Sequence, residues 1–156
     1  MSRRRRKDYV SVLRAILQLL PRTAVQKFIA EFERGLWNAL HHLFPGVPVQ
    51  GCAFHWSQAI FRKIQNTGLV VSYNSKGNTF KFLRKLMAIP FLPVEHISTA
   101  FNKLMDTAPA GRLQTVLRYV QKRWINSRLW PIASWCVFMQ SIRTNNDVDR
   151  KMAQRP

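Results

Sequence analysis

Residues 25–55 read VQKFIAEFERGLWNALHHLFPGVPVQGCAFH, and the predicted fold is built around them. An apolar run from Val25 to Ala30 is followed by the carboxylate of Glu31, and a second apolar run is closed by Cys52 and His55. Between the runs, apolar residues recur at helical spacing. The predicted order is therefore strand, carboxylate, helix, strand and a Cys/His pair. Such a unit predicts two parallel strands, because parallel neighbours need a long crossover between them.

Hydrophobic periodicity and breaking residues predict the elements around this unit. The spacing favours a helix over 8–20, which Asp8 can cap and Pro21 ends. We expect strands at 24–32 and 47–54, helices at 33–43 and 56–67, a loop or hairpin at 68–78, and further helices at 80–88, 94–105, 112–123 and 134–143. The aromatic residues Trp124, Trp130, Trp135 and Phe138 are expected to belong to the core.

The resulting prediction is an α/β chain that is predominantly helical. Two strands seldom make a stable sheet without further strands or firm packing against helices, and parallel strands need both faces covered. We therefore expect that additional sheet belongs ahead of residue 8.

The charge of the chain is strongly positive. It has 25 Lys and Arg against 7 Asp and Glu, a net charge of +18, with a pI near 11.4. Such a balance favours an anionic partner, and nucleic acid is the first expectation. The alternative is a fragment whose acidic part is missing. The run Arg3-Arg4-Arg5-Arg6-Lys7 is typical of a nuclear address or a nucleic-acid clamp, or it is a solvated tail.

The sequence also bears on compartment and membrane. Cys52 and Cys136 are too few for a disulfide framework, so reduced thiols in the cytosol or nucleus are expected. No apolar run approaches the roughly 20 residues that span a bilayer. The segment behind the basic run carries Asp8, Arg14 and Gln18, which argues against a secretory signal. We expect a nuclear protein with no membrane partner and no small-molecule substrate.

Several short motifs in order carry a family resemblance. They are Glu31-Phe32-Glu33, Phe44-Pro45, Gly51-Cys52-Ala53-Phe54-His55 with Gln58, Phe91-Leu92-Pro93, three later tryptophans, and Arg143-Thr144-Asn145-Asn146 followed by Asp149. In this order they resemble the transposases of Mutator-like elements (MULE) over about residues 9–149. That family implies an RNase H-like domain with an Asp-Asp-Glu triad and an all-helical insertion.

The resemblance implies how the chain is organised. We expect a basic tail at 1–8, a partial RNase H-like core at 9–67, a helical insertion at 68–133, a C-terminal core helix at 134–149 and a tail at 150–156. The first catalytic Asp of the family and the first three strands precede the part that matches. The fold implied is thus a partial RNase H-like one with two parallel strands.

The resemblance also assigns two catalytic positions. Glu31 matches the second Asp of the triad, and Asp149 matches the last Glu. This chain thus has Glu where the family has Asp, and Asp where the family has Glu. In the family such carboxylates hold Mg²⁺, which aligns attacking and leaving oxygens on phosphate. Glu31 and Asp149 are the candidate Mg²⁺ ligands, but with no third carboxylate in place we expect no metal cofactor in this chain alone.

Cys52 and His55 have two interpretations. Cys-x-x-His is half of a zinc site, but a structural site needs four ligands and none of His41, His42, His96 and Cys136 supplies a second pair. The resemblance makes the motif a signature beside the active site. The interpretation we favour is a buried thiol and a hydrogen-bonded histidine at the end of the strand.

Basic residues on predicted helices are the candidates for DNA contact: Arg62, Lys63, Arg84, Lys85, Lys122 and Arg123. Contacts of this kind with phosphate give salt-sensitive binding that does not depend on sequence. No zinc-finger or helix-turn-helix pattern predicts base readout.

Three hypotheses follow for function. The first is a truncated MULE-type transposase derivative, inactive alone as an enzyme, that binds DNA nonspecifically. The second is a repurposed basic nuclear protein that binds DNA, itself or the full-length transposase. The third is a fragment of an active transposase that performs metal-dependent cleavage and transfer of DNA strands.

Overall fold

The computed structural model describes residues 5–20 and 24–144. Within these ranges the chain is predominantly helical, with one two-stranded parallel sheet, as predicted. The elements are α1 (Arg6–Leu19), β1 (Phe28–Ala30), α2 (Arg34–Leu43), β2 (Val49–Gly51), α3 (Ala53–Asn66), α4 (Val70–Asn74), α5 (Asn78–Ala88), α6 (Val94–Thr107) and α7 (Arg112–Val120). A π-helical turn, Gln121–Ile125, continues α7, and short 3-10 turns lie at Ile89–Phe91 and Ile132–Ser134.

The two strands pair in parallel, with Phe28 opposite Val49 and Ala30 opposite Gly51. Each strand has three residues, so both are shorter than the predicted 24–32 and 47–54. The reason is local. Pro48 has no N–H to donate and only accepts from the Phe28 N–H (2.9 Å), and α3 begins two residues after Gly51.

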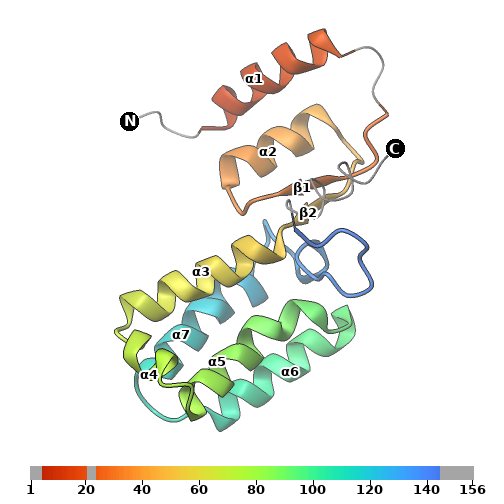
Figure 1. Ribbon diagram of the computed structural model, residues 1–156. Coiled ribbons are helices and arrows are strands. Elements are labelled where there is room, and N and C mark those ends of the chain that lie inside the picture. Colours follow the sequence, from red (N-terminus) through yellow and green to blue (C-terminus); the bar gives the residue numbers. More distant parts are fainter. Residues whose placement is uncertain (1–4, 21–23, 145–156) are drawn as a thin grey trace, which may run out of the picture.

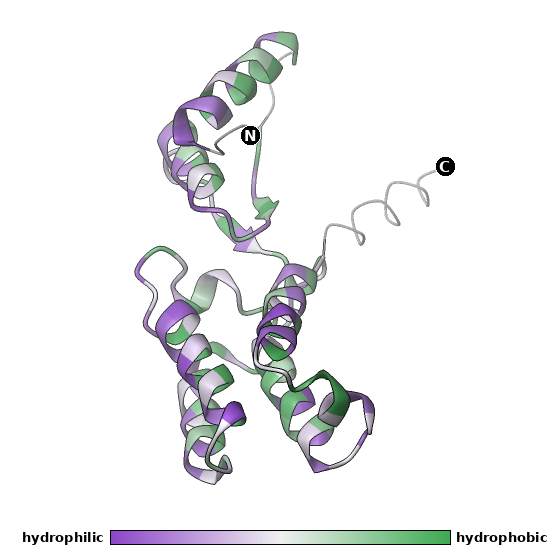
Figure 2. Cartoon of the chain, turned by 90° about the vertical axis from the view of Figure 1, so that its left-hand side faces the viewer, coloured by the Kyte–Doolittle hydropathy of each residue, from purple (hydrophilic) through white to green (hydrophobic). Residues whose placement is uncertain are grey.

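Helices cover the short sheet on two sides (Figure 1). α1 and α2 lie on one side and α3, α4, α5, α6 and α7 on the other, an arrangement also visible in the turned view of Figure 2. α1 packs against α2. The helix begins earlier than predicted, so Arg5 is its N-cap and Asp8 is its third residue, where the Asp8 Oδ2 accepts from the Arg5 N–H at 3.2 Å.

The apolar face of α1 is only partly covered. No residue of this helix is buried, and Val12, Ile16 and Leu19 are exposed. Hydrophobic colour gathers toward its carboxyl-terminal end (Figure 2). Among the described residues, no helix is both long enough and apolar enough to cross a bilayer.

The core is dominated by tryptophan. All five Trp side chains are at most 2% exposed: Trp37, Trp56, Trp124, Trp130 and Trp135. Trp56 stacks on Trp135 with ring centroids 4.7 Å apart, and meets Trp124 edge-on at 4.9 Å. The expectation of core positions is confirmed for Trp124, Trp130 and Trp135 but is wrong for Phe138, which is 42% exposed.

Residues 68–78 are not the predicted loop or hairpin, because they contain the short helix α4. Gly68 ends α3 with a φ of +69°, a left-handed conformation that glycine adopts at little cost. Leu69 is then buried, and its carbonyl accepts from the Tyr73 N–H at 2.8 Å. Burial of Leu69 and of the face it shares with Tyr73 thus outweighs the polar composition on which the loop prediction was based.

The predicted helix at 134–143 is also wrong. Apart from the 3-10 turn Ile132–Ser134 at its start, the segment of residues 132–144 is irregular, and we name it the strap. Its backbone groups bond to distant partners: the Val137 N–H donates to the Pro90 carbonyl (2.7 Å), and the Cys136 carbonyl accepts from Gln50 Nε2 (2.9 Å). Met139 has a φ of +56°, which no right-handed helix accommodates.

The strap joins segments that are far apart in the sequence. The Arg143 carbonyl accepts from the Ala53 N–H at the start of α3 (3.0 Å), and Lys27 Nζ donates to Gln140 Oε1 (2.7 Å). Desolvation lowers the pKa of Lys27 below its ordinary value. The strap therefore ties the sheet and the start of α3 to the helices beyond.

Candidate nucleic-acid interface

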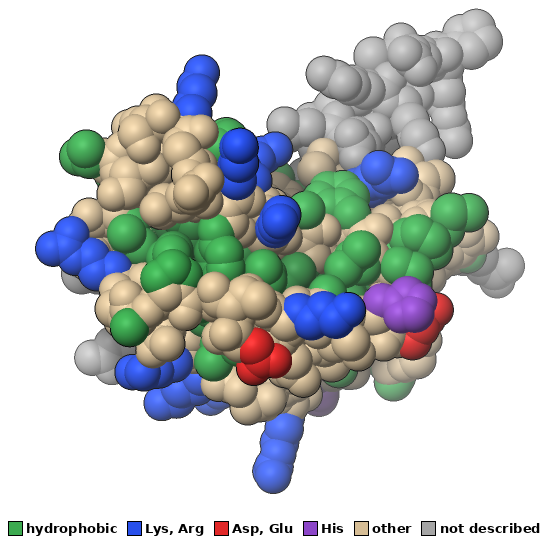
Figure 3. All heavy atoms as spheres, turned by 90° about the horizontal axis from the view of Figure 1, so that it is seen from below, with side chains coloured by type: hydrophobic (Ala, Val, Ile, Leu, Met, Phe, Trp, Pro, Cys, Tyr) green, Lys and Arg blue, Asp and Glu red, His purple; other side chains and the backbone are tan. Residues whose placement is uncertain are grey.

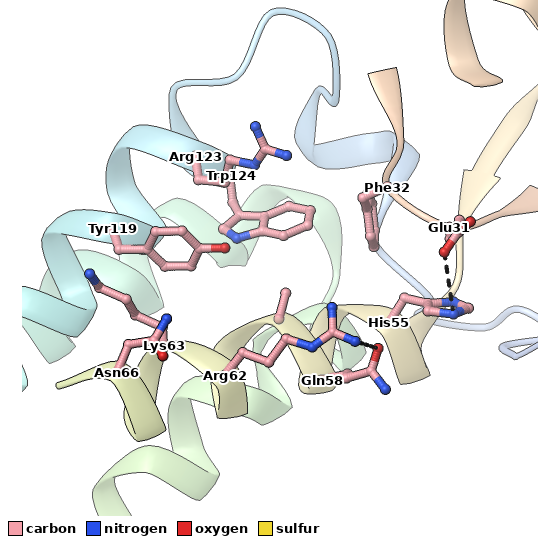
Figure 4. Close-up of a pocket in the computed structure, with 11 residues that line it drawn as sticks. Glu31, Phe32, His55, Gln58, Arg62, Lys63, Asn66, Tyr119, Arg123 and Trp124 are labelled. Atoms are coloured by element: carbon pink, nitrogen blue, oxygen red, sulfur yellow. Dashed lines mark hydrogen bonds and ion pairs between the residues drawn. The ribbon is translucent and has the colours of Figure 1, made fainter. Parts of the chain in front are cut away.

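A groove lies between α3 and the end of α7 with its π-helical continuation, and we name it the α3–α7 groove. Its volume is about 470 Å³. It is lined by Glu31, Phe32, His55, Gln58, Ala59, Arg62, Lys63, Asn66, Tyr119, Arg123 and Trp124 (Figure 4). At the far end of the helix pair, Arg112 Nη1 donates to the Gly68 carbonyl (3.1 Å), which ties the start of α7 to the end of α3.

One wall of the groove is a single face of α3. Its lining residues recur every three or four positions from His55 to Asn66, which is the spacing of one helical face. The opposite face of α3 carries the buried residues Trp56, Ile60 and Ile64. The apolar face anchors the helix in the core, and the polar face is thereby turned to the groove.

The other wall combines cations with aromatic rings. The Arg123 guanidinium lies 4.2 Å over the ring of Trp130, and the Tyr119 ring of this wall faces Lys63 of α3, whose Nζ lies 5.6 Å from the ring centroid. Trp124, 1% exposed, forms the inner surface. On the α3 side, Arg62 Nη2 donates to Gln58 Oε1 at 2.9 Å. Cationic groups thus come from both walls (Figure 4).

Glu31, Phe32 and His55 close one end of the groove (Figure 4). The indole N–H of Trp37 donates to the Glu31 carbonyl (2.8 Å), which holds the chain where it leaves β1. Glu31 Oε2 lies 3.9 Å from His55 Nε2, too far for a hydrogen bond, and the side chains are 44% and 25% exposed. This pair is attractive as an ion pair only when His55 is protonated.

Glu31 and His55 also line a second hollow, of about 460 Å³, on the other side. Its remaining walls come from α1, α2 and β1, through Leu13, Phe28, Ile29, Ala30, Leu36 and Leu40. The acid–histidine pair therefore stands between a polar groove and an apolar hollow.

Phe32 is wedged between β2 and the tryptophans. Its ring meets Trp124 edge-on at 4.4 Å and Trp130 at 5.8 Å, and it also lies against Gly51. A Cβ added at Gly51 would overlap the end of the Phe32 ring. The ring cannot withdraw without disturbing the tryptophans.

We expect Gly51→Ala to lower the free energy of unfolding by about 1–3 kcal/mol, the usual cost of overpacking a filled site. Urea denaturation followed by far-UV circular dichroism measures the change. Gly46→Ala is a comparison at a glycine where an added Cβ meets nothing within 4 Å, although its φ of +83° adds backbone strain. A Gly51→Ala protein as stable as the parent would contradict this packing.

The structure tests only part of the predicted metal site. Asp149 lies outside the described residues, so its pairing with Glu31 stays a prediction. In the ranges that the structure describes, no group of three or more His, Cys, Asp or Glu side chains is placed to hold a metal ion.

Cys52 and His55 lie at the beginning of α3. The Cys52 thiol is buried, as we favoured, and its backbone N–H donates to the Ala30 carbonyl (3.0 Å) at the end of β1. His55 faces Glu31, at a distance that gives an ion-pair contact rather than the hydrogen bond that we expected. Cys136 is buried elsewhere, with its Sγ 3.2 Å from the Leu92 carbonyl.

The predicted DNA-contact residues fall into two groups. Arg62, Lys63 and Arg123 come together in the groove, although the helices that carry them are far apart in the sequence. Lys122 is exposed beside Arg123 but does not line the groove. Arg84 and Lys85 are exposed on α5 and are also outside its lining.

Sequence reasoning assigned no part in DNA contact to several uncharged lining residues, Phe32, Gln58, Asn66 and Tyr119, although Phe32 and Gln58 belong to the quoted motifs. The spacing of His55, Gln58, Arg62 and Asn66 was a detectable signal, because it marks one polar helical face. Tyr119 gave no such signal, since its place in the groove depends on how α7 packs against α3.

No protein-family model matches the chain, and no curated protein or solved structure matches it either. The resemblance to Mutator-like transposases thus stays a prediction from the quoted motifs.

Proposed function

We propose that this chain is a DNA-binding protein of Mutator-like transposase origin, which contacts the phosphate backbone without reading sequence and does not cut DNA by itself. The observation that carries the proposal is the α3–α7 groove, which is lined by Arg62 and Lys63 of α3 and by Arg123 of the π-helical turn that continues α7. Guanidinium and ammonium groups are the usual protein donors to phosphate oxygens.

The charge of the whole molecule supports the same partner. The net charge is +18, and the face seen in Figure 3 carries scattered Lys and Arg side chains with few acidic ones. A field of this sign attracts a polyanion over distances of a Debye length, about 8–10 Å at physiological salt. A nuclear location suits such a partner.

The catalytic part of the proposal concerns Glu31. We propose that β1, α2, β2 and α3 are part of an RNase H-like core, in which Glu31 occupies the position of the second catalytic acid. The parallel β–α–β order and the place of Glu31 directly after β1 support this. Glu31 is one methylene longer than Asp, and among the residues that the structure describes no second acidic side chain lines the groove beside it, which favours binding without strand cleavage.

Two matched double variants test the proposal. Arg62→Ala with Lys63→Ala removes two groove cations, and Arg84→Ala with Lys85→Ala removes an identical pair from α5. We expect the groove variant to bind mixed-sequence duplex DNA more weakly and to lower the slope of log K against log salt by about 2. The α5 variant should keep most of the slope. Fluorescence anisotropy over a salt titration measures both.

The comparison controls for net charge, because both variants lose two positive charges from adjacent positions on a helix. Equal losses in the two variants would mean that charge alone, and not the groove, accounts for binding. An absence of DNA binding by the parent chain would reject the proposed function.

A further inference from the structure

The shape of the α3–α7 groove bears on which form of nucleic acid it takes. Its volume of about 470 Å³ is in the range of sites that enclose a small molecule. Proteins that read duplex DNA insert a convex element, such as a helix, into the major groove. In a recess between two helices the roles are exchanged, because the nucleic acid inserts a segment into the protein. A separated nucleotide can enter such a recess, whereas a base-paired one is held in the duplex.

The aromatic lining matches this ligand. Tyr119 is half-buried on the wall of the groove, and Phe32 is half-buried at the end that Glu31 closes (Figure 4). Stacking of bases on aromatic side chains beside a cationic track is how proteins bind single strands without sequence preference. Duplex phosphates would use the cations but not the rings.

The charges along the groove give the strand a preferred placement. Arg62, Lys63 and Arg123 flank the part that Tyr119 lines, and Glu31 lies at the closed end. A carboxylate repels phosphate, so the phosphates are expected over the cations and away from Glu31. Amide groups of Gln58 and Asn66 on α3 can donate to or accept from any base edge.

We propose that the α3–α7 groove binds single-stranded DNA in preference to duplex, with phosphates on Arg62, Lys63 and Arg123 and a base stacked against Tyr119. This inference rests on the proposed function, since it names the form of DNA that the same groove takes.

The test compares a short fluorescein-labelled oligothymidylate with a duplex of the same length at one salt concentration, by anisotropy with the full chain. We expect tighter binding of the single strand. Tyr119→Leu should weaken that binding about 5- to 100-fold and weaken duplex binding less, because only the single strand loses a stacked base. Tyr119→Phe, which keeps the ring, should bind the single strand within about 2-fold of the parent.

Three other results would each contradict either the single-strand inference or the proposed function. If duplex binds as tightly as the single strand or more tightly, the single-strand inference fails and the proposed function stands. If Tyr119→Leu weakens both ligands equally or neither, the stacking role fails. If neither ligand binds the parent chain, the proposed function and the inference fail together. If Tyr119→Leu does not fold, the preference of the parent chain for single strand or duplex still tests the single-strand inference.

Discussion

Replacing Trp56 with alanine is expected to lower the free energy of unfolding by about 3–5 kcal/mol. Trp56 is fully buried, stacks on Trp135 at 4.7 Å and meets Trp124 at 4.9 Å, so its removal leaves a cavity among rigid rings. Domains of this kind are stable by only about 5–15 kcal/mol, so this change removes a large part of the total. Urea denaturation followed by far-UV circular dichroism measures it.

Phe54→Ala is the matched control for this prediction. Phe54 is also an aromatic residue in the first turn of α3, but it is 53% exposed. Its truncation should change the free energy of unfolding by about 0.5 kcal/mol or less, as is usual at the surface. Similar effects of the two variants would show that the tryptophan cluster does not hold the chain together.

Raising the salt concentration from about 50 to about 200 mM is expected to weaken duplex DNA binding by about 10³-fold or more. Each phosphate that a Lys or Arg neutralises releases a counterion, and six or more such contacts give a loss of this size. The chain has 25 Lys and Arg, enough to make them. Anisotropy titrations at several salt concentrations measure the slope.

The anion of the salt provides a control, because replacing chloride with glutamate at equal ionic strength should keep the steep slope. An affinity that stays constant over this range would contradict a phosphate-dominated interface. In that case base contacts or apolar contacts would have to supply the binding.

Much of the local structure follows from periodicity. Periodicity predicts the parallel pair β1 and β2, the helix between them and the helices α5, α6 and α7. Apolar residues recur every two positions on a buried strand face and every three to four positions on a buried helix face. Glu31 was singled out by its place after a strand, and it does lie at the groove.

The predictions of secondary structure are wrong where contacts with residues distant in the sequence determine the backbone conformation. Residues 134–143 have helical spacing, yet the strap bonds instead to Pro90, Gln50 and Ala53, which lie far away in the sequence. Composition likewise predicts a loop at 68–78, but burial of Leu69 at the end of α3 favours the helix α4. A local window of sequence contains neither the hydrogen-bond partners of the strap nor the core against which Leu69 packs.

The strong positive charge, the β–α–β order and the helical faces can all be predicted without the structure, because they depend on residue type and local spacing. Only the tertiary structure decided that Arg62 and Lys63 share a groove with Tyr119 and Arg123 while Arg84 and Lys85 do not. The physical reason is packing: α3 and α7 each bury an apolar face in the tryptophan core, and this brings their polar residues together.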